Sequence, residues 1–192
     1  MISVDTAIKI VTDAVEPRPP KTVPFESALG LCLAHDVQSD IDMPPFDRSA
    51  MDGYAVIAED TLDAPVELMV IEDIAAGYMP KKKILRGQVS KIMTGAAVPE
   101  GSDAVVKFEE TEDLLANNRV KILKSVRKGI NISRRGEDMQ IGQTVLHRGM
   151  PIRPQEIGIL ATVGKSQVEV FSAPAIGIIS TGTELVDVES KP

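Results

Sequence analysis

The chain has 192 residues and a formal net charge of −7, and 43% of its residues are hydrophobic but only 3% are aromatic. This length is enough for one ordinary domain or two small ones, whose cores must be filled by aliphatic side chains. The acidic balance argues against nucleic acid as a partner, and the absence of a long apolar run argues against a membrane. With the single Cys32 and no N-terminal export signal, we expect a cytoplasmic protein without disulfides.

The N-terminal segment predicts a helix followed by extended chain. Apolar residues at helical spacing favour an amphipathic helix over residues 3–15, with Ser3 as its N-cap. Prolines from Pro17 onward end this helix. After a turn at Gly30, we predict a strand over residues 31–37.

The middle of the chain, residues 54–146, consists of short alternating runs separated by turn residues, which is typical of an all-β domain. Helical character returns at Arg153 and ends at Gly164, and a strand, "QVEVF", follows. We therefore predict an α+β fold in which an irregular all-β domain is inserted into a small, discontinuous α/β domain. The expected boundaries are residues 1–45 and 146–174 for the small domain and residues 46–145 for the inserted domain.

The last part of the chain has a different character. The run from Ala175 to Ile179 carries no polar side chain, which is typical of a strand buried on both faces of a parallel sheet. Such a sheet needs partner strands and crossover helices, for which the few residues after Ile179 do not suffice. We therefore expect residues 175–192 to be the first strand of a truncated third α/β domain. The alternative is an edge strand of the small domain.

Most standard catalytic and metal-binding patterns are missing. His35, His147 and Cys32 do not have zinc-site spacing, and the sequence lacks a nucleophile elbow and a P-loop. Three polar stretches remain as candidates for a functional site.

The first stretch, "MPPFDRSAMDGYAV", begins at Met43. Its side chains Asp47, Ser49 and Asp52 can bond nearby backbone N–H groups and so hold an irregular loop. Capping of the loop accounts for Asp47, but it does not require Arg48, Ser49 and Asp52 as well. Taken alone, the stretch is equally compatible with a structured loop and with a binding site.

The second and third stretches contain groups that suit anions. In "KIMTGAAVPEGSDAVV", Thr94 is followed by small residues, so a hydroxyl beside free N–H groups suits phosphate or molybdate, although an ordinary turn has the same pattern. In "NISRRGEDM", Arg134 and Arg135 could grip a phosphate. The alternative is that they form salt bridges with Glu137, Asp138 or the acidic run upstream.

Together with "RPQEIGILATVG" and "IGIISTGTELV", these stretches resemble the molybdopterin molybdenumtransferases, or molybdenum insertases, in their order and spacing. This family includes bacterial and archaeal MoeA and the E domain of gephyrin. The resemblance implies four domains in about twice this length, of which this chain matches the first two and the start of the third. It also implies a homodimer with a cleft between domain three of one subunit and domain two of its partner.

The resemblance implies an activity in molybdenum cofactor biosynthesis. Molybdate is inserted into adenylylated molybdopterin with release of AMP, and Mg²⁺ assists. On this basis this chain alone is expected to be inactive and to bind molybdopterin poorly. The alternative is a non-catalytic dimerisation or scaffold module with the same fold.

The resemblance also implies roles for individual residues. Asp52 is expected to position the substrate or a hydrated metal, Thr94 to donate its hydroxyl to an oxyanion, and Glu184 to hold Mg²⁺ or a nucleotide group. Ser133 departs from the arginine that is usual at this position in the family, and the set of metal ligands is left open. The residues expected to bind substrate are Ser49, Arg134 and Arg135.

Overall fold

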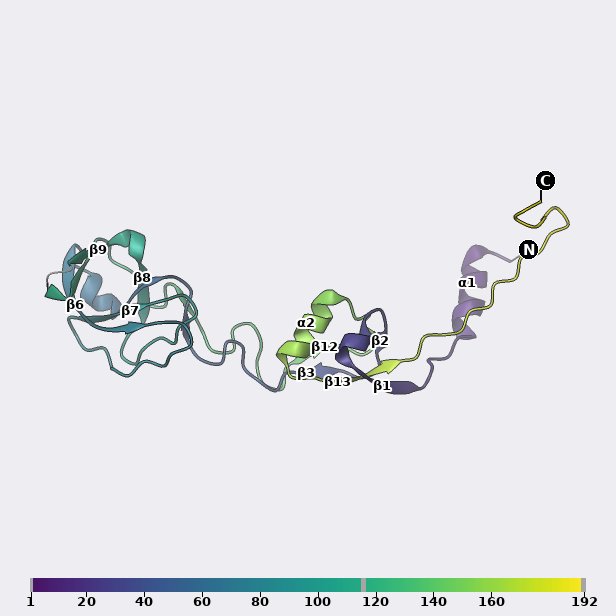
Figure 1. The fold of residues 1–192 in the computed structure, drawn as a ribbon, viewed down its shortest axis with the longest axis horizontal. Coiled ribbons are helices and arrows are strands. Elements are labelled where there is room, and N and C mark those ends of the chain that lie inside the picture. Colours follow the sequence, from purple (N-terminus) through teal and green to yellow (C-terminus); the bar gives the residue numbers. More distant parts are fainter. Residues whose placement is uncertain (1, 115–116, 191–192) are drawn as a thin grey trace. The chain divides into compact units, whose positions relative to one another are not determined.

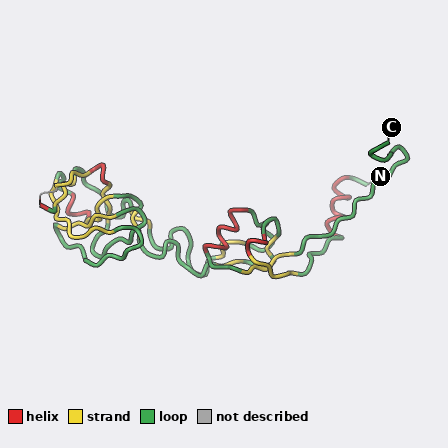
Figure 2. Tube along the Cα trace, in the orientation of Figure 1, coloured by secondary structure: helices red, strands yellow, loops and turns green. Residues whose placement is uncertain are grey.

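The computed structural model describes residues 2–114 and 117–190. Residues 191 and 192, the end of the expected segment 175–192, are outside the described part, as are residues 1, 115 and 116. Figure 2 shows helices and strands joined by long loops. The described residues therefore have the mixed composition that the sequence predicts.

Two compact units make up the chain (Figure 1). We call Met1–Val37 together with Leu146–Pro192 the discontinuous unit, and Gln38–Val145 the inserted unit. The predicted α+β fold, an all-β part inserted into a discontinuous α/β part, is confirmed. The exact domain boundaries expected from the sequence stay a prediction.

Both helices of the discontinuous unit begin as the sequence predicts. Helix α1 (Val4–Asp13) follows Ser3, whose Oγ accepts the Thr6 N–H at 3.2 Å, but none of its residues is buried. Helix α2 (Pro154–Thr162) starts with proline, and the Glu156 carboxylate accepts the N–H of the N-cap residue Arg153 at 2.9 Å. Neither of these described helices is long and apolar enough to cross a bilayer.

An antiparallel three-stranded sheet completes the discontinuous unit, in the order β1-β13-β2. The strand predicted over residues 31–37 is interrupted, because the chain leaves β13 after Leu33 and β3 then pairs with β12. The elements of this unit are β1 (Pro20–Pro24), the short 3-10 helix η1 (Phe25–Ala28), β2 (Cys32–Leu33) and β13 (Gln167–Phe171). Strands β3 (Val37–Gln38) and β12 (Thr144–Leu146) each include the boundary between the two units.

A six-stranded sheet forms the centre of the inserted unit, in the order β8-β5-β7-β6-β10-β9. Only β6 and β7 are parallel; the other neighbours are antiparallel. Two short strands, β4 and β11, pair separately. The elements are β4 (Arg48–Ser49), β5 (Gly53–Val56), η2 (Ala58–Thr61), β6 (Val66–Ile74), β7 (Gln88–Ile92), β8 (Ala104–Lys107), η3 (Phe108–Glu110), β9 (Thr111–Leu114), β10 (Arg119–Ile122) and β11 (Ile132–Ser133).

Strand β5 is buried on both faces of this sheet. Tyr54 and Val56 belong to one apolar cluster, while Ala55 packs in a second cluster with Ile74 and Ile92. Successive side chains of a strand point to opposite faces, so the two clusters lie on opposite sides. The polar loop that leads into β5 is therefore anchored at one end in the core of the unit.

The segment from 172 to 190 contains no helix or strand in the described chain. Ile176, Ile178 and Ile179 are largely exposed, so the strand expected from Ala175 is not formed here. A strand needs a partner for its backbone groups, and no described segment pairs with this one. Its assignment to a third domain stays a prediction.

Candidate functional site

Two of the three polar stretches lie side by side as an antiparallel ribbon. The N–H of Val98 donates to the carbonyl of Asp47 at 2.9 Å. Ser49 donates its N–H to Ala96 O at 2.9 Å and accepts the N–H of Gly95 at 2.8 Å. We call residues 47–52 and 94–98 the motif ribbon.

Ser49 holds the bend of the motif ribbon from inside. Its side chain is buried, and its Oγ donates to the Met51 carbonyl at 2.6 Å and accepts the Met51 N–H at 3.3 Å. Gly53 then enters β5 so close to β8 that an added Cβ would lie 1.9 Å from Val106 O. The bend is therefore fixed from both sides, and the substrate-binding role expected for Ser49 stays a prediction.

Asp52 and Thr94 meet at the exposed end of the motif ribbon. Asp52 Oδ1 accepts both the backbone N–H and the hydroxyl of Thr94, each at 2.7 Å. Thr94 is the second residue of a turn that the Ala96 N–H closes on the Met93 carbonyl at 3.0 Å. Gly95 takes the third position with a φ of 82°, which suits a type II turn. The structure thus brings together two residues that the resemblance names separately.

The electrostatics of this pair settle which group is the donor. The pKa of Asp52 lies below its ordinary value, because the Thr94 N–H and then its hydroxyl bond the ionised form. An ionised carboxylate only accepts hydrogen bonds, so the Thr94 hydroxyl donates to it. Among residues 2–114 and 117–190, no group donates to Oδ2 of Asp52.

The third stretch pairs with the motif ribbon through β11 and β4, and at the Asp47 end it adds ion pairs. Arg134 pairs with Asp47, which also accepts the N–H of Arg135 at 2.9 Å, while Arg135 Nε donates to Asp42 at 2.7 Å. The salt-bridge alternative therefore describes these arginines, but their side chains pair with partners other than the expected acids; Glu137 accepts only the Arg134 backbone N–H.

The arginines and nearby backbone N–H groups lower the pKa values of both carboxyl groups. The pKa of Asp42 lies below its ordinary value, because the Ile141 N–H and then Arg135 bond its ionised form. Burial raises the pKa of Asp47, but the hydrogen bonds from the Arg135 N–H and from Arg134 outweigh burial and lower it overall. At neutral pH both carboxyl groups are therefore ionised.

Glu184 belongs to the discontinuous unit, whereas the motif ribbon belongs to the inserted unit. Glu184 is exposed and lies in the segment from 172 to 190, which contains no helix or strand. The structure describes each unit by itself, so the expected role of Glu184 stays a prediction.

Known proteins match this chain along nearly its whole length. Residues 2–164 match the family described as MoeA N-terminal region (domain I and II). The chain belongs to this family. It is 38% identical over 191 residues to the molybdopterin molybdenumtransferase of Staphylococcus aureus strain Mu50, and 40% identical over 193 residues to that of Bacillus subtilis strain 168. Each match covers 97% of this chain and 45% of the relative.

The fold of this MoeA-family chain is also that of a solved structure. The molybdopterin biosynthesis moeA protein of Pyrococcus horikoshii OT3 matches it with a TM-score of 0.83 and 36% identity. This match covers 88% of the chain and 46% of the solved one. The chain therefore spans about half the length of the proteins it matches.

The described carboxylates of this MoeA-family chain are dispersed rather than grouped for a metal ion. In the described ranges, no group of three or more His, Cys, Asp or Glu side chains is arranged to hold a metal. Asp52 offers one carboxylate, whereas Mg²⁺ in proteins commonly takes one or two carboxylates together with phosphates of a substrate. The described residues alone therefore do not form a Mg²⁺ site.

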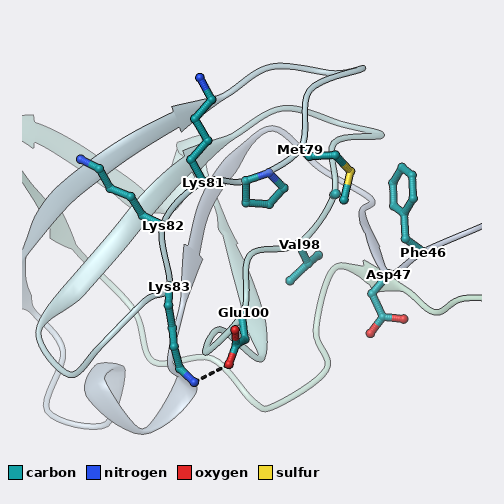
Figure 3. A pocket seen from close by; sticks show the side chains of 10 residues that line it. Phe46, Asp47, Met79, Lys81, Lys82, Lys83, Val98 and Glu100 are labelled. Atoms are coloured by element: carbon teal, nitrogen blue, oxygen red, sulfur yellow. Dashed lines mark hydrogen bonds and ion pairs between the residues drawn. The ribbon is translucent and has the colours of Figure 1, made fainter.

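A hollow of about 410 Å³ lies at the Asp47 end of the motif ribbon (Figure 3). Phe46, Met79 and Val98 give it apolar lining, and Figure 3 shows Lys83 reaching Glu100, to which it is ion-paired. The remaining lining residues are Asp47, Pro80, Lys81, Lys82 and Ala97. This hollow was not predicted from the sequence, although three consecutive lysines in an acidic chain are a visible signal.

Proposed function

We propose that this chain supplies the N-terminal part of a molybdopterin molybdenumtransferase, which inserts molybdate into adenylylated molybdopterin with release of AMP. Relatives of that name match 97% of the chain, which favours this function. The observation that carries the proposal is the contact of Asp52 with Thr94. Two separate motifs meet there at the surface and leave a carboxylate oxygen for a ligand.

The proposed roles follow from the partners of each side chain. Asp52 uses its free oxygen to position the substrate, and Thr94 holds Asp52 in place. Arg134 and Arg135 bind a substrate phosphate only if it displaces Asp47 and Asp42, because both arginines are already paired. Ser49 acts by shaping the loop, since its hydroxyl is buried against the backbone.

Other parts of the proposal concern Glu184, a second subunit and a metal ion. Glu184 contributes from the third domain, which residues 175–192 begin, and the active enzyme is a cytoplasmic homodimer. Mg²⁺ assists the reaction by offsetting the repulsion between anionic reactants. Asp52 could supply one ligand to it, but no step is assigned to the ion, because the described residues provide no complete ligand set.

Turnover by a chimaera tests this function. Residues 1–190 of this chain would replace the matching part of the Bacillus subtilis relative, and molybdenum insertion would be assayed with purified adenylylated molybdopterin and molybdate. We expect turnover by the chimaera and none by the isolated chain, whose affinity for molybdopterin should be low. A chimaera that folds and dimerises like the parent but does not turn over would favour a scaffold module instead.

A further inference from the structure

Thr94 directs two donors to the same oxygen of Asp52. The N–H and the hydroxyl both lie 2.7 Å from Oδ1, and Oδ2 has no donor among the described residues. The N–H belongs to a closed turn, so its direction is fixed by the backbone. The hydroxyl adds a second bond that holds the plane of the carboxylate and fixes the direction of Oδ2.

The backbone of Asp52 is also fixed by contacts with its surroundings. Its carbonyl accepts the Phe108 N–H at 3.2 Å, and Gly53 after it is packed against β8. Before it, the bend at Met51 is tied to the buried Ser49. The one freedom left to Asp52 is rotation of its side chain, and Thr94 removes that freedom.

The hydrogen bonds also decide what this pair can offer to a ligand. The Thr94 proton is already given to Asp52, so the hydroxyl oxygen has only lone pairs to present outward. Oδ2 of an ionised carboxylate is likewise an acceptor. An oxyanion such as molybdate or phosphate would meet acceptors only, and two groups of lone pairs repel each other.

We propose that Thr94 is a positioning residue that acts through Asp52, and that together they present an acceptor surface to a hydrogen-bond donor. The recognised group is an N–H, an O–H or the water shell of a cation, and not a bare oxyanion. This identification of the ligand group rests on the proposed function, whereas the positioning of Asp52 does not. It replaces the expectation that Thr94 donates its hydroxyl to an oxyanion.

The positioning is tested on the isolated chain, without any ligand. Carboxyl carbons of aspartate are followed by NMR across an acid titration for the unaltered chain, Thr94→Val, Thr94→Ala and Thr94→Ser. We expect Val and Ala to raise the pKa of Asp52 toward its ordinary value and Ser to preserve it, because only Ser keeps the hydroxyl. The pKa of Asp47, bound at the other end of the motif ribbon, is the internal control and should not change.

Two results of the titration are decisive. Because both variants keep the Thr94 N–H, a pKa of Asp52 that does not rise above that of the unaltered chain in either variant, with Asp47 unchanged, would overturn the positioning. A spectrum in which Asp52 alone shifts supports it. Because Thr94 is exposed and its turn is closed by backbone groups, both variants keep the contacts that hold the loop.

Asp52→Asn tests the chemistry of the ligand group. The Thr94 N–H requires an acceptor, so the asparagine oxygen should take the Oδ1 position and its NH₂ should replace Oδ2. This change turns the free acceptor into a donor with almost the same shape. In the active chimaera we expect turnover to fall about 10- to 100-fold, since a hydrogen bond to a charged group is lost. Faster turnover would show that the ligand group is an acceptor, such as an oxyanion, and unchanged turnover would show that this atom contacts no ligand group; either result overturns the assignment.

Substituting Thr94 with and without Asp52 present shows whether Thr94 contacts the ligand itself or acts through Asp52. We expect Thr94→Val to lower turnover about tenfold in the unaltered chimaera but less than about twofold when Asp52 is already Ala. Thr94→Ser should restore activity. Equal losses in both backgrounds would mean that Thr94 contacts the ligand itself. If the unaltered chimaera is inactive, the proposed function and the ligand assignment fail together, while the NMR titration still decides the positioning.

Discussion

The two ends of the motif ribbon bind their carboxylates in opposite ways. Asp47 has both oxygens occupied, one by Arg134 and the other by the N–H of Arg135. Asp52 receives two bonds on one oxygen, and no donor from the described ranges reaches the other. A carboxylate with both oxygens engaged joins segments of the fold, whereas one with a free and oriented oxygen is available to a ligand. We therefore infer a structural role for the Asp47 end of the motif ribbon and a ligand-binding role for the Asp52 end.

The largest expected effect comes from Gly53, where the Asp52 end enters the sheet. In Gly53→Ala the new Cβ would lie 1.9 Å from Val106 O, so β5 and β8 must separate. We expect the free energy of unfolding of the inserted unit to fall by about 3 kcal/mol or more. Denaturation followed by tyrosine fluorescence measures it, because both tyrosines, Tyr54 and Tyr78, lie in this unit and the chain has no tryptophan.

Gly77→Ala is the control for this substitution. Gly77 has a φ of 84° but open space around it, so alanine adds backbone strain without a collision. We expect a loss of about 1 kcal/mol. If Gly53→Ala were no more destabilising than Gly77→Ala, the tight entry into β5 would not be what fixes Asp52.

Acidification is expected to have the second largest effect on stability, because it protonates carboxylates at both ends of the motif ribbon. The pKa values of Asp42, Asp47 and Asp52 are lowered by hydrogen bonds in the folded chain. Below the ordinary aspartate pKa of about 3.9, the unfolded chain therefore binds more protons than the folded one, and falling pH favours unfolding. We expect the melting temperature to be steady above about pH 5 and to decrease steadily toward pH 3.

The doubly substituted chain Asp42→Asn/Asp47→Asn shows how much of this acid effect belongs to the arginine end. It should start from a lower melting temperature at pH 7 and change less between pH 5 and pH 3. Calorimetry at several pH values gives both quantities. A melting temperature that rises on acidification of the unaltered chain would contradict the stabilising role of these carboxylates.

Ser49→Ala weakens the bend between the two ends. The hydroxyl of the buried Ser49 bonds both the N–H and the carbonyl of Met51, so alanine would leave these two groups of the bend without this partner. We expect about 1 kcal/mol of destabilisation in the fluorescence assay. Ser125→Ala, at an exposed position of the same unit, is the control and should be neutral. A neutral result for Ser49 would mean that the bend is held by the backbone alone.

Local signals in the sequence were sufficient to predict much of the fold. The Ser3 cap, the proline at the start of α2 and the alternating runs of the inserted unit each depend on neighbours a few residues away. The strand expected from Ala175 was not found, because strand formation depends on a partner that no described segment supplies.

The sequence and its family resemblance named the candidate residues but not their arrangement. Asp52 and Thr94 are 42 residues apart, and Arg135 is 93 residues from Asp42, so no local pattern indicates their contacts. The family resemblance named Asp52 and Thr94, but it gave them separate roles. Only the geometry shows that the Thr94 proton is used within the pair, which reverses what its hydroxyl can offer.

Asp47→Asn is expected to change the free energy of unfolding least. It is also the most direct test of the difference between the Asp47 and Asp52 ends of the motif ribbon. Asparagine still accepts the Arg135 N–H but loses the charge that attracts Arg134. The Asp47 side chain is 37% exposed, so water and salt screen this ion pair, and we expect a loss of only about 0.5 kcal/mol. Asp47→Ala, which removes both bonds, should lose roughly 1 kcal/mol in the same assay. If Asp47→Asn were as damaging as Asp47→Ala, the charge of Asp47, and not its engagement of both oxygens, would be what joins the arginines to the motif ribbon.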